Sequence, residues 1–208
     1  MDALRDSLIP FLTILNPLAL CLYLTGVMED LERKDFARVL AWACLISLLT
    51  FWVFAAAGEP LLIGFFGIHT SALRMFGGVI FFVLAYNYVV KGYRTAEMLR
   101  GSLDELPSAI ALPFMIGAGT LTQSIFIGER HPTWVALVVI LIGIAISYGI
   151  VFAFKLVRDH MRGARERIFD RYVNILVRVN GLLIGAISTE MVVSSLRDLY
   201  GTPVPSGG

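Results

Sequence analysis

Apolar residues gather in six long runs along the chain, and charged residues, Gly or Pro separate one run from the next. The runs cover residues 7–27, 36–57, 70–90, 106–127, 133–154 and 172–196. A helix needs roughly 20 mostly apolar residues to cross the hydrocarbon of a bilayer, and each run is about that long. The pattern therefore predicts an all-α integral membrane protein with six transmembrane helices.

The composition agrees with a membrane environment. Hydrophobic residues make up 57% of the chain and the mean hydropathy is +0.77, whereas soluble domains are roughly 45–50% apolar. The chain has too little polar surface for a water-soluble globule, so we expect no soluble enzyme. A net charge of +1 without a basic stripe offers nucleic acid no surface, and the expected partner is the lipid bilayer.

Lys and Arg divide unequally between the two sides of the predicted membrane. The two termini and the even-numbered connections carry four, at Arg5, Arg74, Arg130 and Arg197. The odd-numbered connections carry twelve, six of them from Lys155 to Arg171. Because loops rich in Lys and Arg stay in the cytoplasm, we expect a multi-pass protein of the cytoplasmic (inner) membrane with both termini outside.

Two short matches suggest an internal repeat. Pro10-Phe11 recurs as Pro113-Phe114 at an offset of 103, and the Arg74-x-x-Gly77 pattern recurs from Arg178 at an offset of 104. The matches predict two three-helix repeats, 1–100 and 101–200, followed by a disordered tail at 201–208. Three is odd, so the repeats would insert with opposite topology, which is the inverted-repeat plan of secondary transporters.

The first and fourth predicted helices each carry residues that interrupt a helix. Proline removes a backbone hydrogen bond, and glycine weakens a helix and lets another chain approach closely. We therefore expect helices 1 and 4 to be broken and a substrate site to lie between the breaks. The candidate residues for this site are Asn16, Pro17, Gly117, Ala118, Gly119, Thr120, Thr122 and Gln123.

Broken helices in lipid expose amide and carbonyl groups that a ligand can satisfy. A half-helix N-terminus attracts a carboxylate and freed carbonyls attract a cation, so the expected substrate is a small zwitterion. We expect no cofactor beyond Na⁺ or H⁺ as a coupling ion. His69, His131 and His160 are dispersed and predict no metal site.

Four charged residues near or within the predicted spans are candidates for ion coupling or gating. Glu190 lies inside the sixth predicted span, where a carboxylate is costly and is a candidate proton carrier. Alternatively, Glu190 is a static partner of Arg74, or its side chain reaches the membrane surface. Arg178, the repeat mate of Arg74, and Glu59, before the short apolar segment 60–68, complete the set. That segment is too short to cross and is expected to be re-entrant.

The aromatic residues near span ends and the two cysteines are expected to have structural roles. Tyr86, Tyr88 and Trp134 lie near span ends, as is usual for interfacial aromatic residues. Cys21 and Cys44 both lie within spans, so a disulfide framework is not expected. A transmembrane thiol oxidoreductase is a further alternative, although a symmetric cysteine pair would need one cysteine in each repeat.

Several motifs resemble the MarC family of membrane proteins. They are Asn16-Pro17-Leu18-Ala19, the stretch from Gly58-Glu59-Pro60 to Ile68, Leu73-Arg74-Met75-Phe76-Gly77-Gly78, and Gly181-Leu182-Leu183. The resemblance implies a six-helix fold akin to the LysE superfamily. It also implies ion-coupled transport or export of a small neutral amino acid such as alanine or glycine.

The chain departs from the family pattern in four places. Ala19 and Leu20 replace the usual Gly-Asn after Asn-Pro-x, Ala118 replaces the proline of Gly-Pro-Gly, and Glu190 stands where Gln is usual. These departures support an alternative function as a non-transporting structural or regulatory membrane subunit. A homo-oligomer also fits the apolar spans, because lipid and a partner helix contact an apolar face alike.

Overall fold

The computed structural model describes residues 2–60, 64, 67–91, 104–160 and 164–200, and in these residues all regular structure is helical. The predicted all-α fold is thus confirmed for them. The predicted re-entrant segment 60–68 lies largely, and the tail 201–208 wholly, outside the described residues. The helices are α1 (Asp2–Leu15), α2 (Pro17–Tyr23), α3 (Thr25–Asp30), α4 (Arg33–Glu59), α5 (Thr70–Lys91), α6 (Leu106–Ile110), α7 (Ala118–Arg130), α8 (Thr133–Asp159) and α9 (Ala164–Tyr200).

Five stretches of the described chain are long and apolar enough to cross a membrane. They are Arg5–Tyr23, Arg33–Gly58, Thr70–Lys91, Thr133–Asp159 and Arg171–Tyr200. The run at 106–127 forms no single long helix, because α6, a π-helical turn at Ala111–Met115 and α7 divide it. The chain is therefore a helical, multi-pass membrane protein.

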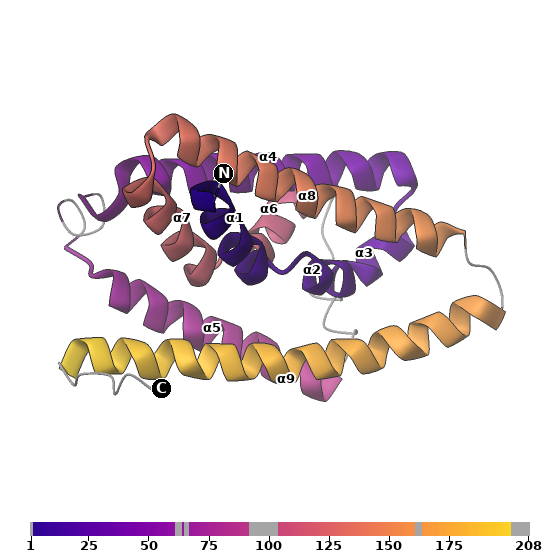
Figure 1. Cartoon of the computed structure of the whole chain (residues 1–208). Coiled ribbons are helices and arrows are strands. Elements are labelled where there is room, and N and C mark those ends of the chain that lie inside the picture. The colour runs from indigo at the N-terminus through magenta and orange to yellow at the C-terminus, as the bar shows by residue number, and fades with distance from the viewer. Residues whose placement is uncertain (1, 61–63, 65–66, 92–103, 161–163, 201–208) are drawn as a thin grey trace.

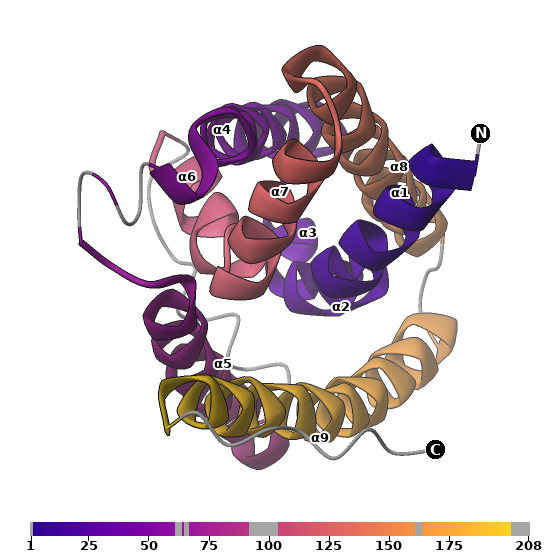
Figure 2. The same cartoon turned by 60° about the vertical axis from the view of Figure 1, so that its left-hand side comes forward.

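The helices form a bundle and a separate two-helix layer (Figures 1 and 2). In the bundle, α4 packs against α7 and α8, and α8 packs against α1 and α2. Helices α5 and α9 lie side by side along their length and form the layer. Contacts of α5 with α7 and of α9 with α2 join this layer to the bundle.

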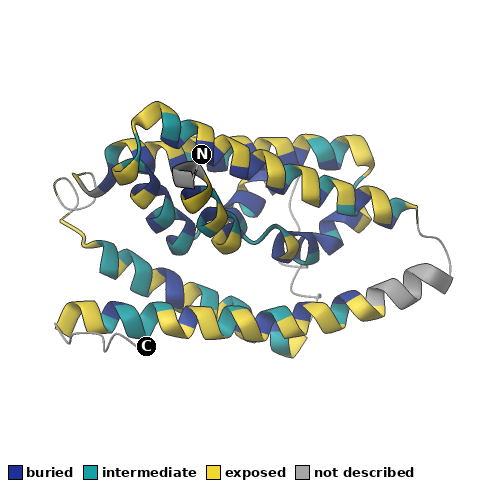
Figure 3. Cartoon of the chain, in the orientation of Figure 1, coloured by how far each residue is buried: buried dark blue, intermediate teal, exposed yellow. Residues whose placement is uncertain are grey.

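Burial divides the inner and outer faces of these helices (Figure 3). Phe11 of α1 and Phe51 of α4 are fully buried in the bundle, where their rings meet edge to face with centroids 5.4 Å apart. The outward faces of α5 and α9 instead expose large apolar side chains such as Phe76, Phe82 and Leu182. Such faces match a hydrocarbon solvent, since lipid tails are as apolar as leucine.

Helix α8 reaches Asp159, beyond the predicted end of its span at 154. Lys155 and Arg158 therefore lie on this helix, and both side chains are buried. The prediction that these two residues lie in the connection after the fifth span is therefore wrong.

Helices α4 and α7 approach each other so closely that their backbones touch. A Cβ atom added to Gly128 of α7 would lie 1.8 Å from the carbonyl oxygen of Ala55 in α4. Only glycine fits at this position without movement of the backbone. At Gly149 of α8, in contrast, an added Cβ atom would meet no atom within 4 Å.

This contact predicts that Gly128→Ala destabilises the protein while Gly149→Ala does not. The new methyl group at 128 would force α7 away from α4, and overpacking of this kind costs about 1–3 kcal/mol. At 149 the same change only improves helix propensity. Thermal unfolding of the two purified variants in one detergent tests this, and equal melting temperatures would contradict the contact.

Candidate functional site

The chain leaves the helical path at Asn16, between α1 and α2. Asn16 adopts a left-handed conformation with φ 46° and ψ 73°, which Asn tolerates better than most residues. Its Oδ1 accepts a hydrogen bond from the Ala19 N–H at 3.1 Å, so Asn16 caps α2. Pro17 occupies the first position of α2, where its missing N–H costs nothing. The Asn-Pro pair thus ends one helix and begins the next.

A second interruption precedes α7. Ile116 and Gly117 are extended, and α7 begins at Ala118. The Gly117 N–H donates to Thr120 Oγ1 at 2.9 Å, and that hydroxyl lies 2.9 Å from the carbonyl oxygens of both Met115 and Gly117. The buried Thr120 hydroxyl therefore accepts the Gly117 N–H and has one hydrogen to donate to these two carbonyl oxygens.

A pocket of about 120 Å³ lies where these two interruptions face α5 and α9. We call it the central pocket. Asn16 and Gly119 both line it, so the structure brings together one candidate residue from each interrupted region. An added Cβ atom at Gly119 would lie 3.0 Å from Ile14 Cγ2. Among the described lining residues none is charged.

Aromatic side chains form one wall of the central pocket. Tyr23 of α2 stacks on Tyr88 of α5 with ring centroids 4.3 Å apart, and Phe114 lies 5.5 Å from Tyr23. Asn180 of α9 donates its amide to the Tyr23 hydroxyl at 3.0 Å. The prediction that Tyr88 is an interfacial aromatic is wrong, because its side chain is only 2% exposed. Phe81, Leu84 and Tyr88 recur at helical spacing along one face of α5, a pattern that could have identified this wall.

Three further candidate residues, Ala118, Thr122 and Gln123, lie on α7. Ala118 packs against Gly77 of α5, where an added Cβ atom would lie 1.9 Å from the Ala118 Cβ. Thr122 is buried, and its Oγ1 has no hydrogen-bond partner in the described part of the chain. Gln123 is partly buried. None of these three is among the described residues that line the central pocket.

The charged candidates lie away from the central pocket. Arg74 Nη1 donates to Asp198 Oδ2 at 3.2 Å, which joins α5 to α9. The alternative pairing of Arg74 with Glu190 is therefore wrong. Glu190 and Arg178 are exposed on α9, and Glu59 ends α4 with a side chain outside the described residues.

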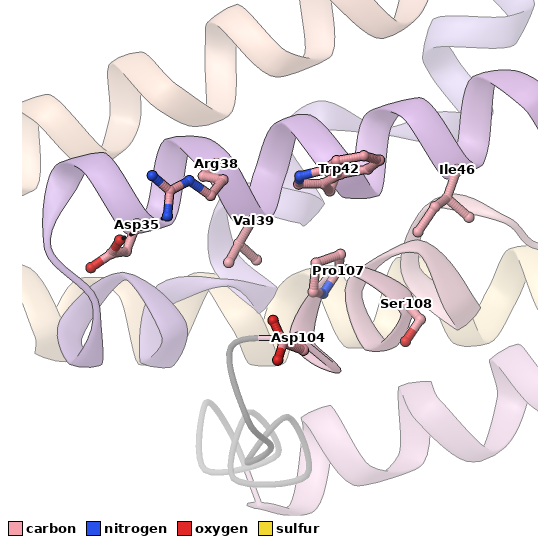
Figure 4. Close-up of a pocket in the computed structure, with 8 residues that line it drawn as sticks. All are labelled: Asp35, Arg38, Val39, Trp42, Ile46, Asp104, Pro107 and Ser108. Atoms are coloured by element: carbon pink, nitrogen blue, oxygen red, sulfur yellow. Dashed lines mark ion pairs between the residues drawn. The ribbon is translucent and has the colours of Figure 1, made fainter.

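A larger depression of about 470 Å³ lies on the outer side of α4, near the start of α6 (Figure 4). Trp42, which is 55% exposed, and Pro107 line it together with the weakly paired Asp35 and Arg38, 4.0 Å apart. Its described lining contains no residue of either helix interruption. The central pocket is therefore the stronger candidate for a functional site.

Comparison with known proteins connects this architecture to one family. The family described as "MarC family integral membrane protein" matches residues 1–200. The chain is 26% identical to a UPF0056 membrane protein of Pyrococcus horikoshii, over 93% of each chain. It is 22% identical to the UPF0056 inner membrane protein YhgN of Escherichia coli, over 95% of this chain and 98% of the relative. No solved structure matches the chain.

The geometry at Asn16 predicts a graded response to substitution. Asn16→Gly keeps the left-handed conformation and loses the bond to the Ala19 N–H, whereas Asn16→Ala loses both. Replacement of a capping residue by Gly costs only a few tenths of a kcal/mol and by Ala about 1 kcal/mol. We expect the melting temperature to fall in the order wild type, Asn16→Gly, Asn16→Ala. Equal stability of the two variants would show that the conformation of residue 16 is unimportant.

Proposed function

The chain belongs to the MarC family of integral membrane proteins, and we propose that it is a secondary transporter or exporter of small neutral amino acids such as alanine or glycine. The observation that carries the proposal is the central pocket, where two interrupted helical regions meet. Interrupted helices at matching positions of two repeats typically mark the substrate site of a transporter.

The size and chemistry of the central pocket favour a small neutral solute. Its volume of about 120 Å³ is well below the roughly 300–1,000 Å³ of pockets that hold drug-sized ligands. The first turn of α7 reaches the pocket at Gly119, and free N–H groups at a helix start favour a carboxylate. The wall of Tyr23, Tyr88 and Phe114 leaves space for only a short side chain.

An inverted repeat is the second part of the proposal. Helices α4 and α8 are both 27 residues long, and they begin 100 residues apart, at Arg33 and Thr133. They run in opposite directions, as do α5 and α9 (Figure 1). Helix α4 packs on α7 much as α8 packs on α2. This correspondence supports alternating access, in which one half rocks against the other around the central pocket.

The membrane and its polarity are also proposed. The relative YhgN is called an inner membrane protein, and we assign this chain to the same membrane with both termini outside. Transport would be coupled to Na⁺ or H⁺. Glu190 lies outside the central pocket, so a proton carried there would act at a distance from the substrate.

Flux measurements test this function directly. Purified protein in proteoliposomes should move radiolabelled alanine or glycine when a Na⁺ or pH gradient is imposed. Gly119→Leu should reduce this flux at least tenfold, because the new side chain meets Ile14 and fills a pocket of only about 120 Å³. Gly149→Leu is the matched control, since nothing lies within 4 Å of an added Cβ atom there.

The flux assay also separates the alternatives. Flux equal to that of empty liposomes for a wide amino-acid panel, from protein that remains folded, would exclude amino-acid transport. That result would favour a non-transporting subunit, for which an obligatory membrane partner should then co-purify.

The cysteines provide a further prediction. Cys21 and Cys44 are both free and buried, and neither lines the central pocket among its described residues. The double variant Cys21→Ser, Cys44→Ser should therefore retain its amino-acid flux. Loss of flux in the folded double variant would instead support the thiol oxidoreductase alternative.

A further inference from the structure

The helix bundle has two ends, and different residues close them at positions that correspond between α4 and α8. Because these helices begin at 33 and 133, Ala55 corresponds to Lys155, and in the preceding helices Met28 corresponds to Gly128. The first contact, between Ala55 and Gly128, closes the end where α7 finishes. The second, between Met28 and Lys155, closes the opposite end, beside α3 (Figure 1).

The α7 end is closed by direct contact of backbones. No side chain separates α4 from α7 there, because an added Cβ atom at Gly128 would lie 1.8 Å from the Ala55 carbonyl oxygen. A hydrogen bond between Ser7 Oγ and His131 Nε2, 2.9 Å apart, also ties α1 to the end of α7. Separation here would forfeit dense packing and expose apolar surface.

The α3 end is closed by a buried ammonium group. Lys155 Nζ donates to the carbonyl oxygens of Met28 at 2.6 Å and Leu31 at 3.0 Å, and to Asp159 Oδ1 at 2.8 Å. These bonds use all three donors of the side chain, which is only 4% exposed. The carbonyls at the end of a helix lack partners and carry partial negative charge, so they suit a cation.

Arg158 extends this contact toward the central pocket. Its Nη1 donates to the Thr25 carbonyl oxygen at 2.5 Å, and its Nη2 pairs with the carboxylate of Glu29. Thr25 follows closely after Tyr23, which forms part of the aromatic wall of the central pocket. A movement of α3 away from α8 would therefore carry the edge of the pocket with it.

We propose that Lys155 and Arg158 are the latch of a gate between α3 and α8, on the membrane face that carries Arg33 and Lys34. This inference rests on the proposed function, because it takes the central pocket as part of a transport pathway. The charged latch can separate because water replaces the protein partners of ammonium, guanidinium and carbonyl groups. At Gly128 the helices are held by packing, and water cannot replace packing contacts. The α7 end therefore stays closed while the α3 end opens.

Accessibility of the central pocket to a thiol reagent tests the latch. The parent protein carries Cys21→Ser, Cys44→Ser and Ala19→Cys, which places one cysteine in the pocket lining. Lys155→Met keeps the length of the side chain and removes its donors. A small membrane-impermeant thiol reagent, applied to the face that carries Arg33, should then label the cysteine at least tenfold faster. The variant loses three hydrogen bonds to the ammonium group, and the loss of one hydrogen bond to a charged group alone corresponds to about tenfold.

The matched control is Arg38→Met, which removes a cation from the same end of the bundle where its side chain is 75% exposed. It should leave the labelling rate unchanged, and labelling from the opposite membrane face should be unchanged in both variants. An unchanged rate in Lys155→Met, or an equal rise in Arg38→Met, would overturn the proposal. No amino acid takes part in this assay. Faster labelling without amino-acid flux would therefore support the gate and exclude the proposed substrate. Flux without faster labelling would support the substrate and exclude the gate.

A second measurement needs no substitution in the latch. The Leu31 N–H donates to Val27 at 3.1 Å, and the corresponding His131 N–H donates to Ile127 at the same 3.1 Å. These two backbone bonds are equal in length, whereas the anchoring differs, because Lys155 holds the first region and the contact of Gly128 with Ala55 holds the second. In the unmodified protein, hydrogen exchange across 27–31 should be about tenfold faster than across 127–131 if the α3 end opens. Equal or slower exchange at the α3 end would overturn the gate.

Discussion

Every backbone polar group inside a bilayer needs a hydrogen-bond partner in the protein, in a water-filled cavity or in a ligand, and this constraint decides how the chain can be interrupted. At each interruption a nearby side chain forms hydrogen bonds with freed backbone groups. Asn16 accepts the Ala19 N–H through its side chain, and Thr120 Oγ1 accepts the Gly117 N–H and lies 2.9 Å from the Met115 and Gly117 carbonyl oxygens. Because these bonds are local, the interruptions need no ligand to persist. The central pocket can therefore stay formed when it is empty, as an alternating-access site requires.

The sequence predicts features that depend on residue type within a single helix. The length of the apolar runs located α4, α5, α8 and α9, because span length follows directly from bilayer thickness. The left-handed Asn16 and the extended Gly117 lie at proline- and glycine-containing motifs, where residue type disfavours a helix for equally local reasons. Tyr88 could not be placed in this way, because its burial depends on how α9 crosses α5. Gly181 allows that approach, with an added Cβ atom only 3.0 Å from Tyr88 Cβ.

Residue types alone could not predict which side chains on different helices pair with one another. Arg74 is equally compatible with Glu190 and Asp198 in sequence, and the register of α5 against α9 selects Asp198. The burial of Lys155 could not be predicted for a related reason. Two of its three partners are carbonyl oxygens, of Met28 in α3 and of Leu31 directly after it. Every residue has a carbonyl, so no pattern of side chains reveals the bond.

An inverted repeat makes its two closed ends equivalent only if the corresponding residues match. Two identical ends would give the inward-open and outward-open states equal free energies, so that neither state would be favoured before a ligand binds. Gly128 and Lys155 break this equivalence, because one end closes through backbone packing and the other through bonds that water can replace. If the halves are inverted mates, as we propose, these substitutions select the resting state. The departures from strict symmetry then decide which conformation the empty protein prefers, whereas the substrate and ion gradients set the direction of net flux.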